Sequence, residues 1–401
     1  MAEVISFYTG YINASTGVSS VVKSLDKGQW SSFAMTHSIY SLDQQFTSKP
    51  VGPKSNSPSL GYNLKSKCIL VLSSVRMWLW RQADKSSFMA VIYFKLFHLA
   101  RADKLVKSFI SQGTGDKNLI VHDIWSLITL LKQGYSMDKI IFVIHGSNDP
   151  ISFMVDVFPK MRKTNFLKNI ESDFLFALSK VKSVVVLSEE NRIQLQNKYG
   201  VETQLILNGI PELAPKQSNI DNLNLHITGS LCSRKRQYLL VEAIAKLPVN
   251  FISENSVKLN IFGHGPDYNK LKRRILELNL EQVIILHGNT DAPYNNYKYG
   301  DLILSISTEE GLPVALIEGL RSGCVPVVTD VGGCHLTAAN DNGVLLSTFD
   351  DDSLINELCV VITELSNIQV RETFASRSLS LFKSSFSNKK MVSLYAKAIS
   401  S

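Results

Sequence analysis

The sequence predicts an α/β protein made of two doubly wound parallel-sheet domains that face each other across a central cleft. Short, apolar, β-branched segments alternate with helical patterns through both halves of the chain, which is typical of parallel sheets with crossover helices. A length of 401 residues suits two domains of roughly 200 residues each. A stretch with two prolines and no periodicity separates the halves. We therefore predict an N-terminal domain at 1–210, a linker at 211–222, a C-terminal domain at 223–380, and a last helix at 381–401 that returns to the first domain.

The strands predicted for the N-terminal domain are short apolar runs followed by polar or glycine residues. They lie at 4–8, 32–36, 68–72, 119–121, 140–144, 184–187 and 204–207. After the first strand, Gly10 and Gly17 bracket a loop before a helix that begins near Val18. Such a loop points backbone N–H groups at the space between domains, so Gly17 is a candidate anion-binding position. Glycines in a strand-to-helix turn also serve backbone geometry alone.

Residues 301–333 combine more consistent signals than any other stretch of the chain. A buried strand at 301–307 leads into a polar turn, a helix whose first position is Pro313, a left-handed end at Gly323 and a second strand at 325–328. Glu310 falls in the turn and Glu318 on the helix. Ligands bind at the carboxyl ends of strands in an open α/β sheet, so both acids are candidate site residues.

A basic turn precedes another predicted helix in the C-terminal half. A strand at 224–228 leads into Arg234, Lys235 and Arg236, and the helix starts near Gln237. Cations beside a helix N-terminus are unfavourable unless an anion is present, so a phosphate ligand explains them economically. A solvated basic turn is the alternative.

Two histidines end predicted strands of the N-terminal half. His145 begins a His-Gly pair at a carboxyl end, which indicates an imidazole in the cleft. For His122 a structural role and a functional role are equally open.

Charge and aromatic residues are unevenly distributed along the chain. Residues 1–210 hold 24 Lys and Arg against 15 Asp and Glu, which leaves 18 against 20 for the remainder. A basic half suits a nucleic acid, an anionic membrane or an anionic substrate, and equally a solvated surface. The segment 77–107 mixes tryptophans, phenylalanines and basic residues, so it either packs on the core or lies on a membrane surface.

Composition argues against several other classes of protein. Five cysteines without metal-ligand spacing indicate reduced thiols, and we expect no metal site. No apolar run reaches the length of a transmembrane helix, and the N-terminus has no basic region or cleavage site. We therefore expect a cytoplasmic protein, either free in the cytoplasm or in peripheral contact with the cytoplasmic face of the inner membrane. Residues 350–352 are all aspartate, and we interpret them as the cap of a following helix.

The assembled motifs resemble the retaining, nucleotide-sugar-dependent glycosyltransferases of family 4, the glycosyl transferases group 1. EEGLPVALIEGLRSGCVPVVTDVGG resembles that family's Glu-x7-Glu region over its whole length. Weaker matches are GSLCSRKR, LNIFGHGPDYNKLK, the NGIP turn, the glycine loop at Gly17 and the His-Gly pair. The resemblance implies a GT-B fold, in which two Rossmann-like domains enclose the donor site.

The resemblance also implies roles for particular residues. Lys235, with Arg234 and the backbone of Gly311, Leu312, Pro313 and Val314, would hold the donor diphosphate. Glu318 would accept hydrogen bonds from the ribose and Glu310 from the transferred sugar, while His145 would position donor or acceptor. Such enzymes need no metal when protein cations neutralise the diphosphate, and no covalent nucleophile is assigned.

The sequence departs from the family pattern at two places. Ser230 stands where an arginine commonly reaches the diphosphate, and Arg234 or Arg236 could substitute for it. The segment after Gly332 and Gly333 lacks the acidic residue that the family usually has there, and His335 and Leu336 stand in that place.

The function expected from the sequence is transfer of a sugar from a nucleotide diphosphate sugar to a glycan or lipid-linked glycan acceptor. Surface polysaccharide synthesis, such as that of lipopolysaccharide or capsule, is the expected setting. A sugar-nucleotide epimerase of related fold and a catalytically silent subunit of a polysaccharide assembly complex are the alternatives. A nucleic-acid partner is not expected, because no recognisable module interleaves the basic residues.

Overall fold

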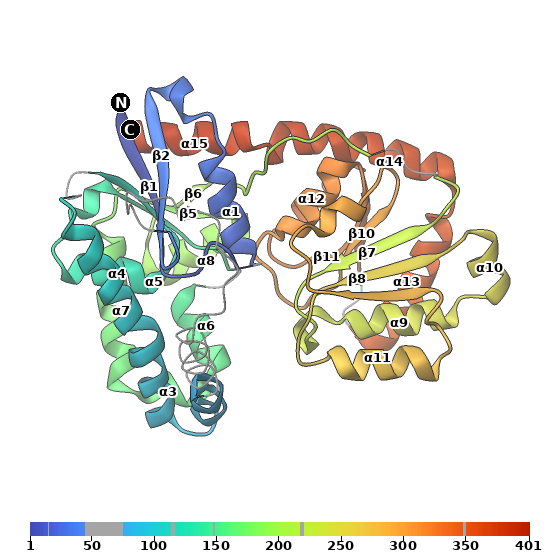
Figure 1. Cartoon of the computed structure of the whole chain (residues 1–401), viewed down its shortest axis with the longest axis horizontal. Helices are drawn as coiled ribbons and strands as arrows, with labels where there is room; N and C mark the ends of the chain where they lie inside the picture. The colour runs from blue at the N-terminus through green and yellow to red at the C-terminus, as the bar shows by residue number, and fades with distance from the viewer. Residues whose placement is uncertain (15, 45–74, 114–116, 147–148, 217–219, 348–349) are drawn as a thin grey trace, which may run out of the picture.

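The computed structural model describes the chain except for residues 15, 45–74, 114–116, 147–148, 217–219 and 348–349. Among the described residues the strands form two separate sheets of six, and every strand pairing is parallel. Figure 1 shows the sheets side by side, each flanked by helices. The doubly wound α/β fold class predicted from the sequence is confirmed.

The N-terminal sheet has the strand order β2-β1-β3-β4-β5-β6. Its strands are β1 (Ala2–Tyr8), β2 (Met35–Ser41), β3 (Asn118–Val121), β4 (Ile140–Val143), β5 (Ser183–Val186) and β6 (Gln204–Leu205). The helices around it are α1 (Gly17–Asp26), α3 (Ser87–Phe94), α4 (Ala100–Ile110), α5 (Ile124–Lys132), α6 (Pro150–Val157), α7 (Asn165–Leu178) and α8 (Glu189–Tyr199). The strand predicted at 68–72 lies outside the described residues.

One predicted strand is misplaced. Residues Trp30–Phe33 form a 3-10 helix, and the chain turns through a left-handed Ala34 before β2 begins at Met35. The cause is a local contact: the buried indole of Trp30 donates to the carbonyl of Leu25 at 2.7 Å. The prediction of a strand at 32–36 is therefore wrong in its first residues.

The C-terminal sheet has the order β12-β11-β10-β7-β8-β9, which is the classical dinucleotide-fold order when its strands are counted from β7. Its strands are β7 (Asn224–Thr228), β8 (Lys258–Phe262), β9 (Ile284–Gly288), β10 (Leu302–Ser305), β11 (Val325–Thr329) and β12 (Val344–Leu346). Its helices are α9 (Gln237–Lys246), α10 (Val249–Glu254), α11 (Tyr268–Glu277), α12 (Val314–Ser322), α13 (Asp351–Glu364) and α14 (Ile368–Leu381). The carboxyl end of β10 faces the other domain through the loop to α12.

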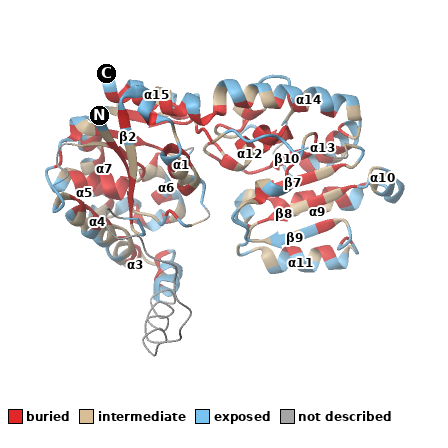
Figure 2. Ribbon diagram, turned by 45° about the horizontal axis from the view of Figure 1, so that its top comes forward, coloured by how far each residue is buried: buried red, intermediate tan, exposed pale blue. Residues whose placement is uncertain are grey.

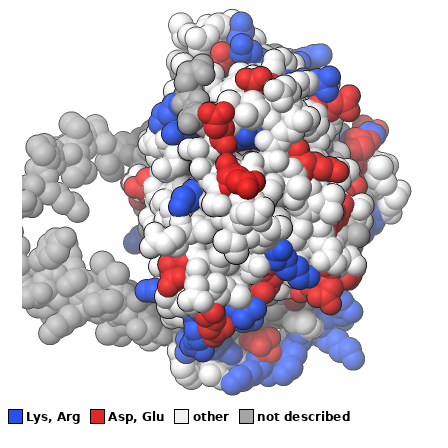
Figure 3. Space-filling view, turned by 90° about the vertical axis from the view of Figure 1, so that its right-hand side faces the viewer, with Lys and Arg blue, Asp and Glu red and all other residues white. Residues whose placement is uncertain are grey.

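Helix capping follows the sequence closely in this domain. Gly323 ends α12 in the left-handed conformation with φ 76°. The side chain of Asp350 accepts from the backbone N–H of Ser353, so the aspartate run caps α13 as expected. Figure 3 shows the outer face of this domain with acidic and basic side chains interspersed, in keeping with its nearly balanced charge.

The last helix, α15 (Asn388–Ser400), lies along the N-terminal domain after a π-helical turn at Phe382–Phe386. Tyr395 is buried in a cluster that also contains Val4 of β1 and Ile317 of α12. The amide of Asn388 donates to the carbonyl of Ser24 in α1. This cluster therefore joins the two domains, and Figure 2 shows buried residues continuing from α15 into both.

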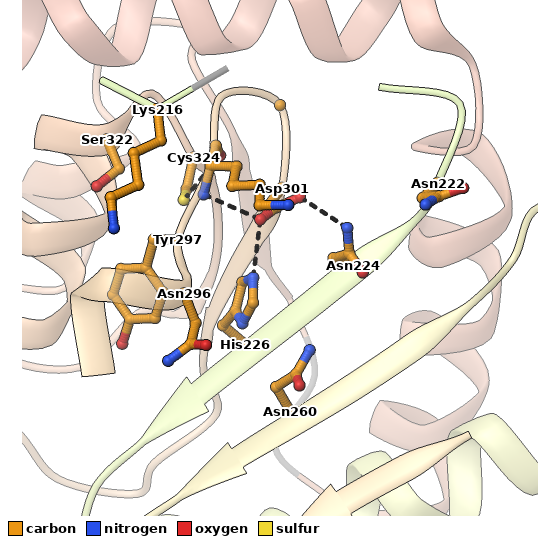
Figure 4. A network of polar contacts seen from close by, with 12 residues as sticks. Lys216, Asn222, Asn224, His226, Asn260, Asn296, Tyr297, Asp301, Ser322 and Cys324 are labelled. Atoms are coloured by element: carbon orange, nitrogen blue, oxygen red, sulfur yellow. Dashed lines mark hydrogen bonds and ion pairs between the residues drawn. The ribbon is translucent and has the colours of Figure 1, made fainter. Parts of the chain in front are cut away.

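A buried polar network ties β7 to β10 near the start of β10 (Figure 4). The carboxylate of Asp301 accepts from Asn224 at 3.1 Å and lies 2.9 Å from Nε2 of His226. Lys216, in the segment that links the domains, donates to the carbonyl of Asn295 at 2.7 Å. Because Asp301 lies before β10, this network is at the edge away from the cleft. We interpret it as structural.

Candidate active site

The loop between β10 and α12 forms the centre of the candidate site. Glu310 is only 8% exposed. Its carboxylate accepts from the hydroxyl of Ser307 at 2.7 Å and from the ammonium of Lys235. A guanidinium nitrogen of Arg234 lies 3.7 Å from the other carboxylate oxygen. Two cations and one acid that are far apart in sequence thus meet where β7 and β10 end.

Close backbone packing places Lys235 at this point. A Cβ added to Gly229 would lie 3.3 Å from the side chain of Lys235, and one added to Gly263 would lie 2.0 Å from the carbonyl oxygen of Gly229. Both glycines have positive φ, so they allow the turns after β7 and β8 to approach each other. The lysine stem then crosses the carboxyl end of β7 toward Glu310.

Arg236 does not join these cations. It is 3% exposed, has a left-handed backbone and pairs with Asp351 at 2.7 Å. The interpretation in which all three basic residues face one anion is therefore wrong for Arg236. Its guanidinium instead holds the start of α13 against α9.

The start of α12 provides backbone donors beside Lys235. The helix begins at Val314, with Pro313 as the N-cap, one residue later than the sequence predicts. Amides in a first helical turn have no carbonyl within the helix to bind, which leaves those of Val314 and Ala315 available to an anion. Leu312 is buried, and its carbonyl accepts from the side chain of Asn208 at 3.1 Å.

Glu318 lies about one helical turn beyond Val314 on α12. Burial raises the pKa of its carboxyl to about 7, and the nearby Arg321 opposes this shift. Among the described residues none donates a hydrogen bond to its carboxylate, and its oxygens keep some exposure to solvent. The carboxylate is therefore free to accept hydrogen bonds from a ligand.

His145 comes from the N-terminal domain, just after β4. An added Cβ at Gly311 would lie 2.1 Å from its carbonyl oxygen, so the two domains touch here. The side-chain amide of Asn191 donates to the carbonyl of Gly146 at 2.6 Å and holds this turn in place. Burial lowers the pKa of the His145 imidazole to about 4, so the ring is neutral at neutral pH.

The remaining predicted positions lie at the edge of this constellation. Gly17 is exposed at the start of α1, after the side-chain cap of Thr16, and an added Cβ would meet no atom within 4 Å. Ser230 is exposed, and its hydroxyl is 3.5 Å from the carbonyl of His264. Ser230 supplies no cation, so Arg234 and Lys235 carry the positive charge of the site.

Sequence reasoning missed several residues that shape the site. Asn191 and Ser307 carry no motif, and their roles depend on contacts between segments distant in sequence. The sequence marks Gly332 only as one member of a glycine pair. An added Cβ there would lie 1.8 Å from the carbonyl oxygen of Glu310, so this glycine lets the turn after β11 cover the loop.

No cluster of three or more potential metal ligands is found among the described residues. The expectation that no metal is needed stays a prediction. In the same part of the chain, each helix is either too short or too polar to span a bilayer.

Two Rossmann-like domains with a cationic site at their junction define the GT-B class of glycosyltransferases. Residues 212–370, less than half of the chain, match the family model for glycosyl transferases group 1.

Two similar proteins of known sequence are glycosyltransferases. The poly(ribitol-phosphate) alpha-N-acetylglucosaminyltransferase of Staphylococcus aureus is 29% identical over 211 residues, which cover 52% of this chain and 41% of that protein. An N-acetylgalactosaminyltransferase of Campylobacter jejuni that acts on N-acetylgalactosamine-N,N'-diacetylbacillosaminyl-diphospho-undecaprenol is 26% identical over 228 residues, or 54% of this chain and 60% of that one. The chain thus spans between two fifths and three fifths of these two relatives.

A solved structure extends the likeness over the whole chain. Anabaena HepE in complex with UDP has a TM-score of 0.61 at 16% identity and covers 100% of both chains. At this identity the likeness shows the fold alone.

Proposed function

We propose that the protein is a retaining glycosyltransferase that moves a sugar from a nucleotide diphosphate sugar to a glycan or lipid-linked glycan acceptor. The observation that carries the proposal is that Lys235, Arg234 and the start of α12 lie around the loop after β10, where Gly311 packs on the backbone of His145. A leaving diphosphate gains charge as the anomeric bond breaks, so fixed cations and N–H dipoles at that point stabilise the transition state.

The ion pair of Lys235 with Glu310 is the resting state in this proposal. Each neutralises the other while the site is empty. A bound diphosphate competes for Lys235, and Glu310 then accepts hydrogen bonds from hydroxyls of the transferred sugar. Carboxylates suit this because their oxygens accept from two hydroxyls at once.

Glu318 recognises the nucleoside in this account. Its carboxylate lies on the same helix whose first turn faces the diphosphate, and it is free of internal hydrogen bonds. Ionised Glu318 would accept from the ribose hydroxyls. Gly17 and the first turn of α1 would lie beside the diphosphate from the other domain.

The protein chemistry of the proposal requires neither a metal nor a covalent nucleophile. Lys235 and Arg234 supply the charge that a divalent ion would otherwise supply. The acceptor hydroxyl would attack the face from which the diphosphate departs, and the departing phosphate would take its proton. Activity that persists in excess EDTA is the expected result, and loss of activity restored by one divalent metal would contradict it.

Relatives that act on poly(ribitol-phosphate) and on a diphospho-undecaprenol glycan favour surface polysaccharide synthesis as the setting. A lipid-linked acceptor would bring the enzyme to a membrane. Segment 77–107 gives this idea partial support. Tyr93 and Phe94 are buried in the core, whereas Trp78 is 55% and Phe88 70% exposed.

Membrane contact through this segment can be tested directly. Figure 2 shows exposed helical surface projecting beyond α3, where the segment lies. The purified protein should sediment with vesicles of anionic phospholipid more than with neutral vesicles, and Phe88→Ser should weaken sedimentation without changing transfer to a soluble acceptor. Equal sedimentation of the wild-type protein and the variant would end this part of the proposal.

The proposed activity is tested with a panel of UDP-, GDP- and ADP-sugars. One donor should be hydrolysed slowly without acceptor and transferred in the presence of a glycan acceptor, with the anomeric configuration retained. An isomerised donor sugar in the absence of acceptor would instead indicate an epimerase. No reaction with any donor, together with unchanged nucleotide binding in Glu318→Ala, would refute the proposal.

A further inference from the structure

A chain of hydrogen bonds runs across the N-terminal sheet and ends at His145. Nε2 of His145 lies 2.9 Å from Nδ1 of His122, and Nε2 of His122 lies 3.3 Å from the hydroxyl of Ser6. The same hydroxyl lies 2.9 Å from Nε2 of His37, whose Nδ1 is 3.2 Å from a carboxylate oxygen of Asp26. These residues lie between positions 6 and 145 of the sequence but meet through side chains alone.

The topology of the sheet explains this meeting. His37 is in β2 and Ser6 in β1, while His122 follows β3 and His145 follows β4. These are consecutive strands in the order β2-β1-β3-β4. The same sheet face carries Val4 and Val143, which pack in the cluster with α15. The chain of hydrogen bonds therefore crosses the sheet one strand at a time, on the face covered by α1 and α15.

Every internal member of the chain is shielded from water. Ser6 is fully buried, His122 is 4% exposed and the side chain of His37 is 1% exposed. Asp26, the last residue of α1, is 40% exposed and is the end that reaches solvent. Burial holds the pKa of His122 well below its ordinary value, so this ring is neutral.

The carboxylate of Asp26 gives the chain a direction. A carboxylate can only accept, so Nδ1 of His37 must carry hydrogen. When each imidazole carries one hydrogen, Nε2 of His37 accepts from Ser6, and Ser6 in turn accepts from Nε2 of His122. Nδ1 of His122 is then bare and accepts from Nε2 of His145. It follows that Nδ1 of His145 has no hydrogen and presents a lone pair.

We propose that Asp26, His37, Ser6 and His122 are positioning residues that hold His145 in the tautomer whose Nδ1 accepts a hydrogen bond from a substrate hydroxyl. His145 is partly exposed, and no partner for its Nδ1 is recorded among the described residues. The inference rests on the proposed function, because it needs a polyol substrate beside His145. It adds that selectivity for that hydroxyl is set from the far edge of the sheet.

The tautomer is tested by spectroscopy on the nucleotide-free protein. With isotope-labelled histidine, a proton–nitrogen correlation spectrum should show Nδ1 of His145 as a bare nitrogen and Nε2 as protonated, the signals being assigned by their loss in His145→Asn. A protonated Nδ1 would overturn the inference. This result does not depend on activity, so it separates the inference from the proposed function.

The direction of the chain is tested at its exposed end. In Asp26→Asn an amide can offer either an oxygen or an N–H, so the second tautomer of His145 should appear in the spectrum. Loss of one well-placed hydrogen bond should then lower kcat/KM roughly threefold to tenfold. Asp26→Glu keeps an acceptor-only end and should retain both the spectrum and kcat/KM. The inference fails if Asp26→Asn changes neither quantity, or changes the spectrum while kcat/KM stays at the wild-type value.

Discussion

At the scale of single residues, the candidate site brings one carboxylate and two cations together. Glu310 is almost buried, and among the described residues its carboxylate contacts Ser307 and the two cations. Breaking a buried pair leaves an uncompensated charge and is strongly destabilising. We infer that this group of charges is arranged to bind a charged ligand, which would replace one partner of the pair.

Glu310→Gln and Lys235→Gln should therefore have different effects on nucleotide affinity. In Glu310→Gln the lysine is released, so a nucleoside diphosphate should bind at least as tightly as to the wild-type protein. Sugar transfer should nevertheless fall roughly a hundredfold, since a contact to the reacting sugar is lost. In Lys235→Gln both nucleotide affinity and transfer should fall. Calorimetry and initial rates measure the two quantities, and equal loss of affinity in both variants would refute the assignment.

Glu318 predicts a pH dependence of donor binding. Its pKa is raised to about 7, and only the ionised form accepts from both ribose hydroxyls. The affinity for a nucleotide sugar should therefore rise with pH through about 7, falling up to roughly tenfold per unit below it. Because the folded pKa exceeds the ordinary value of 4.5, protonated Glu318 contributes to the free energy of unfolding at low pH. This contribution is lost as the pH rises from 4.5 to about 7.

Titrations with a nucleotide sugar suit this test, since its diphosphate stays ionised throughout. Glu318→Gln should bind more weakly than the wild-type protein at high pH and show a flat profile. An unaltered slope in this variant would assign the pH dependence to another group.

At the scale of elements, local signals in the sequence predict where helices begin and end better than they predict what the helices and strands pack against. Asp350 and Gly323 cap the helices expected of them, because capping depends on a few adjacent residues. The strand expected at 32–36 is displaced because Trp30 finds a buried partner in α1. Segment 77–107 divides between core and surface, a distinction that periodicity alone does not make.

The role of α15 is testable through its buried aromatic residue. Tyr395 is 2% exposed within the cluster that joins the N-terminal sheet to α12. Tyr395→Ala should lower the free energy of unfolding by about 3–5 kcal/mol, as large aromatic truncations in cores do. Lys397→Ala on the same helix is exposed and should change it by less than about 0.5 kcal/mol. Denaturant unfolding distinguishes them, and equal small effects would mean that α15 is not part of the core.

At the scale of the whole molecule, the site exists only where the two domains meet. The sequence predicts Glu310, Lys235 and His145 as site residues because each follows a strand, and Glu318 because it lies on the helix after Glu310. It does not predict that Lys235 and Glu310 pair, that Arg236 points elsewhere, or that His145 heads a hydrogen-bonded chain. Those relations depend on strand order and on backbone contacts at glycines, which a single sequence does not display.

Contact between the domains at Gly311 gives a prediction at this scale. In Gly311→Ala the new methyl group would meet the carbonyl oxygen of His145 at 2.1 Å, so the domains must separate. The radius of gyration from X-ray scattering should rise, and kcat should fall more than nucleotide affinity. Asn208→Ala removes a hydrogen bond at the same junction without adding bulk and should leave the radius unchanged. Identical scattering for Gly311→Ala and the wild-type protein would contradict this account of the junction.

The central claim is that Lys235, Glu318 and the start of α12 form a nucleotide-diphosphate site. Thermal unfolding with UDP, GDP and ADP measures it most directly. One nucleotide at about 100 times its Kd should raise the Tm of the wild-type protein by roughly 5 °C. Lys235→Gln and Glu318→Gln should each lose most of that rise. No rise with any nucleotide, or the full rise in both variants, would contradict the account.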